Sequence, residues 1–167
     1  PKAADAYLSI QRRVDALAVV QRNHYAALDE QRGVRARSMM NEIASGLKIS
    51  AQVQSGRNID IAVDCDDVSL HQDVAAPIAF MTAELADLVI ELDTGGCFTI
   101  SLIRLDDDPA RARFALVAPV FRQARAQENG TVALYERVLN GLSRQLRTPL
   151  GHDAARGEYH IIVPIIG

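Results

Sequence analysis

Residues 70–92 read LHQDVAAPIAFMTAELADLVIEL, and one face of this stretch is too apolar to be left in water. Its apolar residues recur at spacings of three and four, the pattern of an amphipathic α-helix about six turns long. They are Val74, Ala75, Ile78, Met81, Leu85, Leu88, Val89 and Leu92. Asp73 suits the positive end of the helix dipole, whereas Pro77 indicates a helix that either begins late or is kinked. We therefore predict a central helix on which the core is built.

The composition is that of one ordinary globular domain, or of one domain with a helical appendage. The 167 residues are 49% hydrophobic but only 5% aromatic, so we expect an aliphatic core. The net charge of −3 gives no reason to expect nucleic acid or an anionic membrane as a partner. The sequence shows neither an apolar run long enough to span a bilayer nor a signal peptide, and we expect a cytoplasmic protein.

Two cysteines and an acidic run are candidate metal ligands by residue type. Cys65 and Cys97 fall in predicted strands without a metal-ligand spacing, and we interpret both as buried free thiols. A disulfide or a metal site is the alternative for the pair. The acidic run Asp64, Asp66 and Asp67 is interpreted as a solvated loop, with a cation site as its alternative. We assign no metal ligand.

The N-terminal residues 3–28 contain neither glycine nor proline and predict one long helix. A seven-residue repeat along it is typical of a seam that packs against another helix. The seam consists of Ala3, Tyr7, Ile10, Val14, Leu17, Gln21, His24 and Leu28. Because such a seam favours self-association into a helical bundle, we predict a homodimer formed through this helix.

The rest of the chain alternates between helical and strand patterns. Strands are indicated by alternation of apolar and polar residues, and turns by glycine, proline and aspartate. The predicted elements are a helix over 34–48 that Gly46 weakens, a turn over 56–58, a strand over 59–63, an antiparallel hairpin with strands over 97–105 and 111–118, a helix over 132–147 and a strand over 157–165.

Two of these stretches resemble sensor histidine kinases. The strings DDVSL at 66–70, APIAF at 76–80 and AELADLV at 83–89 are similar to the nucleotide-binding helix and its approach. The closest branch of the family is the one whose phosphoacceptor helix carries an H-R-V-K-N signature. The string QRRVDALAVV at 11–20 is similar to the second helix of the dimerisation hairpin in that branch.

The resemblance implies an α+β fold in two parts. Residues 1–30 would form a long N-terminal helix, one half of a dimerisation hairpin of the phosphotransfer type. Residues 31–167 would form a degenerate histidine-kinase ATPase-like domain, an α/β sandwich whose mixed, mostly antiparallel sheet is covered by helices on one face. The helix that carries the phosphoacceptor histidine in the family would precede Pro1, outside this sequence.

The residues that hold ATP and Mg²⁺ in the family are replaced in this chain. Ala83 and Leu88 stand where the NELxxNA motif has its two asparagines, and Glu84 is the remnant of the nucleotide-binding helix. The DxGxG motif is replaced by VAPVFR at 117–122, and the lid region at 127–131 reads QENGT, with a single glycine. Because an ATP–Mg²⁺ complex needs its metal ligand, adenine reader and phosphate cradle together, we predict that ATP and Mg²⁺ binding is lost or very weak.

The resemblance implies a two-component signalling protein that acts on a response-regulator receiver domain as a phosphotransferase, a phosphatase or a pseudokinase adaptor. The alternatives are a divergent active sensor histidine kinase and a non-catalytic interaction module. Arg122 and Arg125 are the candidate partner-binding residues, supported by arginines on strand ends predicted to lie nearby, and a solvated basic surface is their alternative. These supporting arginines are Arg104, Arg111 and Arg113. No catalytic residue is assigned.

Overall fold

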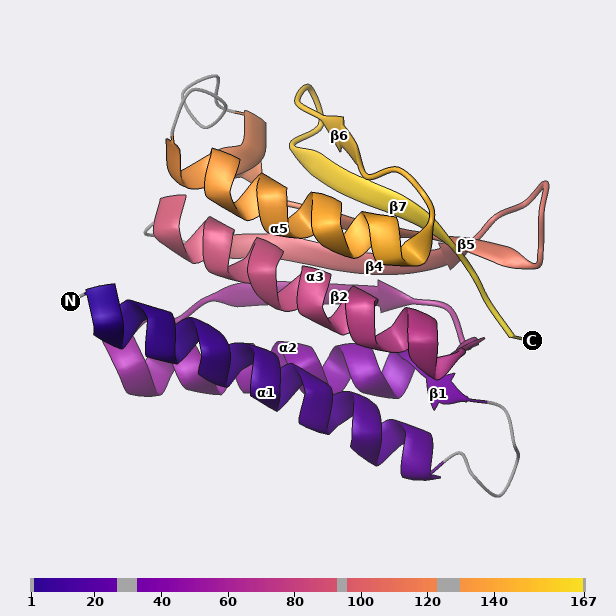
Figure 1. The fold of residues 1–167 in the computed structure, drawn as a ribbon, viewed down its shortest axis with the longest axis horizontal. Helices are drawn as coiled ribbons and strands as arrows, with labels where there is room; N and C mark the ends of the chain where they lie inside the picture. Colours follow the sequence, from indigo (N-terminus) through magenta and orange to yellow (C-terminus); the bar gives the residue numbers. More distant parts are fainter. Residues whose placement is uncertain (1, 27–32, 93–95, 123–129, 167) are drawn as a thin grey trace.

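The computed structural model describes residues 2–26, 33–92, 96–122 and 130–166. Its helices lie in front of one large sheet in Figure 1. None of the described helices has the length and apolarity that crossing a bilayer requires. The elements in chain order are α1 (Lys2–Ala26), β1 (Val34–Arg35), α2 (Ala36–Ser55), β2 (Asp60–Cys65), β3 (Ser69–Leu70), α3 (Gln72–Leu92), β4 (Cys97–Arg104), β5 (Arg111–Val117), the 3₁₀-helix η2 (Pro119–Arg122), α5 (Gly130–Leu146), β6 (Gly151–Asp153) and β7 (Glu158–Pro164).

The large sheet has the strand order β2-β4-β5-β7-β6, with β2 and β4 parallel and the other neighbours antiparallel. The predicted hairpin is confirmed, since Ile100 of β4 lies opposite Leu116 of β5. Successive side chains of a strand point to opposite faces, and the alternate residues Phe98, Ile100, Leu102, Phe114 and Leu116 are all buried. The predicted α+β fold, with a mixed, mostly antiparallel sheet covered on one face by helices, is thereby confirmed (Figure 1).

The central helix α3 begins at Gln72, slightly later than residue 70, and Pro77 lies inside it near its N-terminal end. Every residue from Met81 to Val89 is buried, polar residues included, because α3 packs against α1 on one side and α5 on another while resting on the sheet. Burial of a single apolar face was therefore too narrow a prediction. Helices α1, α2 and α5 together with the sheet therefore surround most of α3.

The helix predicted over 34–48 is wrong at both ends. The residues Val34 and Arg35 form the short strand β1, which pairs with β3, and helix α2 continues to Ser55. Gly46 lies inside the helix, where it costs only about 1 kcal/mol relative to alanine. The buried residues Leu47 and Ala51 hold the following turns against the core, so packing outweighs that cost.

Helix α1 agrees with the predicted N-terminal helix, but the domain buries a different face from the predicted seam. The residues that face the domain are Ala16, Val19, Val20 and Asn23. Four apolar seam residues are exposed, with exposed fractions of 66% for Tyr7, 60% for Ile10, 54% for Val14 and 39% for Leu17, while Leu28 lies outside the described residues. The apolar seam is therefore a surface feature of the part of the chain that the structure describes.

Both cysteines are free thiols, but only one of them is buried. Cys65 ends β2 against the core, and burial raises its thiol pKa to about 12. Cys97 begins β4 and is exposed, so the prediction that it is buried is wrong. Its position explains the difference, because alternate strand residues face opposite sides and the buried neighbour is Phe98.

Candidate functional site

The two residues that stand where the resembled family has asparagines, the second of which helps to hold Mg²⁺ there, lie on α3 inside the packed core. The exposed fraction is 3% for Ala83 and zero for Leu88. Leu88 belongs to the same apolar cluster as Leu85 and Ile100. Aliphatic side chains offer no lone pair to a hard cation such as Mg²⁺. These two side chains can therefore contribute packing but no metal ligation.

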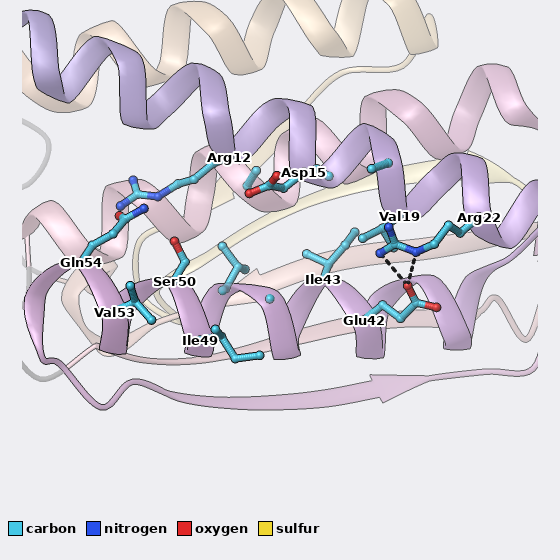
Figure 2. A pocket seen from close by; sticks show the side chains of 15 residues that line it. Arg12, Asp15, Val19, Arg22, Glu42, Ile43, Ile49, Ser50, Val53 and Gln54 are labelled. Carbon is cyan, nitrogen blue, oxygen red and sulfur yellow. Dashed lines mark hydrogen bonds and ion pairs between the residues drawn. The ribbon is translucent and has the colours of Figure 1, made fainter.

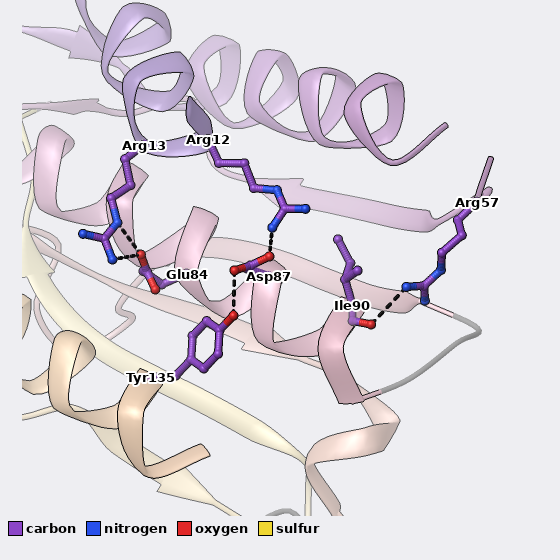
Figure 3. Close-up of polar contacts among 7 residues, drawn as sticks. All are labelled: Arg12, Arg13, Arg57, Glu84, Asp87, Ile90 and Tyr135. Atoms are coloured by element: carbon purple, nitrogen blue, oxygen red, sulfur yellow. Dashed lines mark hydrogen bonds and ion pairs between the residues drawn. The ribbon is translucent and has the colours of Figure 1, made fainter. Parts of the chain in front are cut away.

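The two acidic residues in this part of α3 are bonded to arginines of α1, as Figure 3 shows. Arg13 donates through Nε to Oε1 of Glu84, and its Nη2 forms an ion pair with the same oxygen. The next residue back, Arg12, forms an ion pair with Oδ1 of Asp87. The exposed fractions of Glu84 and Asp87 are only 5% and 8%. Guanidinium groups of the same chain thus neutralise carboxylates that would be costly to bury alone.

Asp87 has a second partner, from the opposite side of α3. The hydroxyl of Tyr135 on α5 donates to Oδ2 of Asp87 across 2.6 Å, while Arg12 contacts Oδ1 (Figure 3). Burial raises the pKa of Tyr135 to about 12, and the carboxylates of Glu91 and Glu84 act in the same direction. The phenol is therefore protonated at neutral pH and can serve as the donor. One carboxylate thereby bonds to both neighbouring helices.

The stretch 117–122, which was predicted to stand in place of the adenine-reading motif of the resembled family, packs into the core. The amide of Ala118 donates to the carbonyl of Gly157 across 2.9 Å. Phe121, in η2, packs edge-on against Tyr159 with ring centroids 5.0 Å apart. Only Pro119 and Arg122 of the four η2 residues are exposed, since Val120 and Phe121 are buried. This stretch therefore presents apolar packing where the family presents an aspartate and glycines.

The predicted cluster of arginines does not form one patch. Arg104 and Arg111 lie at the hairpin end of β4 and β5, whereas Arg122 follows the other end of β5, roughly 20 Å away at 3.3 Å per residue. Arg111 bonds to Asp108 across 2.7 Å, and Arg113 forms an ion pair with the buried Glu158. The prediction that these arginines lie near Arg122 was wrong, because the length of β5 separates the hairpin turn from the segment that carries Arg122. Arg122 is exposed, and Arg125 lies outside the described residues.

One member of the predicted acidic loop, Asp66, is bonded to a neighbouring strand, and another, Asp64, lies within β2 rather than in a loop. Oδ2 of Asp66 accepts a hydrogen bond from the amide of Arg104 across 2.8 Å, which joins the end of β2 to β4. Across the described ranges, no group of three or more histidine, cysteine or acidic side chains is arranged to hold a metal. Glu84, the remnant of the nucleotide helix, is likewise bonded to Arg13.

A groove that the sequence did not predict runs between α1 and α2, with a volume of about 450 Å³ (Figure 2). Arg22 and Glu42 bond across one end of it at 3.1 Å. The α2 side carries Ile49 and Val53, which are 65% and 78% exposed. These residues lie beyond the predicted helix end at 48, and their spacing of four on a longer helix was the signal that could have revealed this face. The apolar lining comprises Ala16, Ala18, Val19, Ile43, Gly46, Leu47, Ile49, Val53 and Ala83.

Comparisons with known proteins show the fold. No protein-family model matches the chain. No curated protein matches it either. Among solved structures, it is similar to the blue-light activated histidine kinase EL346 of Erythrobacter litoralis, with TM-score 0.68 and 19% identity over 94% of this chain, and it spans 54% of that one.

Two further solved structures agree with this similarity. The histidine kinase domain of the same Erythrobacter litoralis protein aligns with TM-score 0.67 and 16% identity over 98% of this chain and 81% of that one. A histidine kinase from Burkholderia phymatum aligns with TM-score 0.53 and 14% identity over 98% of this chain and 96% of that one. At these identities the likeness concerns the fold alone, so the conclusion is that the chain has the ATPase-like α+β fold of histidine kinase domains.

Proposed function

We propose that the chain is a cytoplasmic two-component signalling protein that does not bind ATP and that docks a response-regulator receiver domain. It acts there as a phosphotransferase, a phosphatase or a pseudokinase adaptor. In this proposal residues 1–30 serve for dimerisation, and residues 31–167 are a degenerate ATPase-like domain used as a docking surface. Arg122, which is exposed, and Arg125 are the proposed contacts for an acidic partner face.

The observation that carries the proposal is the state of Glu84. In the resembled family this residue belongs to the motif that approaches the metal and phosphates, but here Arg13 of α1 bonds to it and its exposed fraction is 5%. A carboxylate that is already paired with a guanidinium of the same chain is not available to a metal, and without a metal the negative charges of a nucleotide lack the cation that the resembled family supplies. The buried aliphatic Leu88 supports the same conclusion, because it cannot replace the missing metal ligand.

Isothermal titration calorimetry tests the loss of ATP binding directly. The chain is titrated with a non-hydrolysable ATP analogue in the presence of Mg²⁺, and with Mg²⁺ alone as the control. We expect no saturable heat below about 1 mM, which corresponds to a binding free energy weaker than about −4 kcal/mol. Saturation in the micromolar range would contradict the proposal and favour a divergent active kinase. Radiolabelled autophosphorylation of the full-length protein then tests that alternative.

The exposed seam of α1 supports self-association. Four apolar side chains of one helix stand largely in solvent, which is unusual for a surface without a partner. Light scattering coupled to gel filtration should give twice the chain mass of 18.2 kDa. The double variant I10E/V14E should reduce this to the monomer mass, whereas the control I49E, on the exposed face of α2, should not. A wild-type monomer at high concentration would contradict the predicted dimer.

A further inference from the structure

We infer that Asp87 is a coupling residue that links the packing of α1 against α3 to the packing of α5 against α3. This inference goes beyond the proposed function and does not depend on whether the chain binds a nucleotide. It rests on a buried carboxylate whose two oxygens are held by two different helices. If it is correct, any event that displaces α1, such as association or partner docking, weakens the packing of α5.

The first support is the division of the Asp87 carboxylate between partners. Oδ1 forms the ion pair with Arg12 of α1, and Oδ2 accepts the Tyr135 hydroxyl of α5 across 2.6 Å. Figure 3 shows that both partners contact the same carboxylate, through which they can influence each other.

The second support is burial of both members of the ion pair. The side chains of Arg12 and Asp87 are only 16% and 11% exposed, whereas Arg13 and Arg22, which form the other ion pairs described for α1, are 42% and 62% exposed. Exposed pairs contribute little because water screens them, but removing one member of a buried pair leaves an uncompensated charge. Bonds that meet at a buried group are coupled, because removal of one partner changes the charge and the orientation of the group that the other partner uses.

The third support is the place of these bonds in the fold. Helix α3 packs against both α1 and α5, and Asp87 lies within α3, where its side chain contacts one residue of each. Arg12 fixes the orientation of the carboxylate, and this presents Oδ2 to Tyr135. When α1 dissociates from α3, the carboxylate loses its cation and its fixed orientation. The bond to Tyr135 then loses the geometry on which it depends, and α5 is held less firmly.

Hydrogen exchange measured by mass spectrometry tests the coupling with matched variants. Arg12→Gln should accelerate exchange in peptides from α5 by about threefold or more. The control is Arg13→Gln, which removes the neighbouring guanidinium of the same helix but affects Glu84, for which no bond to α5 is seen among the described residues. It should loosen α1 with no more than a small effect on α5. Equal acceleration of α5 by both variants, or no effect of Arg12→Gln, would overturn the inference.

Because coupling free energies are reciprocal, the experiment has a second arm. Tyr135→Phe should accelerate exchange in α1, whereas Tyr159→Phe should not. Tyr159→Phe is a matched control because it also removes a hydroxyl bonded to its partner across a helix–strand interface, here Glu136 of α5 at 2.9 Å. Acceleration of α1 by both phenylalanine variants to the same extent would refute a specific role for Asp87.

A double-mutant cycle measures the same coupling at equilibrium. The change in the unfolding equilibrium constant caused by the double variant should differ by about threefold or more from the product of the changes caused by Arg12→Gln and Tyr135→Phe alone. The cycle that combines Arg12→Gln with Tyr159→Phe should be additive. If Arg12→Gln does not fold, Arg12→Lys replaces it, since lysine keeps the charge but not the guanidinium geometry. Additivity in the Arg12–Tyr135 cycle would overturn the inference.

Discussion

Replacing Leu88 with asparagine should lower the free energy of unfolding by about 3–5 kcal/mol, although asparagine is the residue that the resembled family has there. The leucine side chain has no exposed surface. Losing its burial costs about 1.5–3 kcal/mol, and leaving a buried amide without partners adds about 1–3 kcal/mol. For a domain of this size the change corresponds to a fall in Tm of about 10 °C.

Urea unfolding followed by far-ultraviolet circular dichroism measures this change, since the chain has no tryptophan to report by fluorescence. The matched control is Leu134→Asn, the same substitution at an α5 residue that is 63% exposed. It should change the free energy of unfolding by less than about 0.5 kcal/mol. A Leu88→Asn variant as stable as the control would refute the reasoning, because it would mean that this side of α3 opens to water and can accommodate a polar ligand.

Three further predictions concern pH, thiol reactivity and backbone conformation. Tyr135 has a pKa of about 12 in the folded chain against 10 when unfolded. Its contribution to stability is therefore complete below pH 10 and is lost as the pH rises towards 12. The urea midpoint of unfolding should fall over that range, and less steeply for Tyr135→Phe. Ellman's reagent should modify Cys97 rapidly and Cys65 only on unfolding, so that Cys97→Ala abolishes the fast phase; a fast phase that persists would contradict the burial of Cys65. Gly157→Ala should destabilise the fold by about 1–3 kcal/mol, because φ is +65° and the added Cβ would lie 2.5 Å from the Ala118 carbonyl oxygen. Gly141→Ala, within α5 and with open space around it, should instead stabilise the fold by about 0.5–1 kcal/mol, as measured by thermal melts.

Much of the fold could be predicted because the signals were local. The spacing of apolar residues in α3 and the alternation in β4 and β5 are visible within a few residues of the chain, and the structure confirms those elements. The end of α2 could not be found in this way. Gly46 is a helix-weakening signal by propensity, but the burial of Leu47 and Ala51 against distant segments decides that the helix continues to Ser55.

The candidate site was predicted from residues that differ from the motifs of the resembled family, and not from the residues that it brings together. The absence of asparagine at 83 and 88 can be read from the letters, and the structure adds that the replacing side chains are packed in the core. The bonds of Asp87 to Arg12 and Tyr135 had no such signal. Arginine, aspartate and tyrosine are ordinary residues on helix surfaces, and nothing in their local spacing indicates that they meet.

Periodicity and composition are properties of neighbouring residues, so they were enough to predict the helices other than the ends of α2, the main strands, the aliphatic core and the apolar seam of α1. The face of α1 that meets the domain and the charges that are neutralised depend instead on contacts between distant segments. Arg13 and Glu84 are 71 residues apart, and their pairing depends on how α1 lies across α3. Long-range packing brings such groups together, and a buried carboxylate then requires the cation that packing supplies.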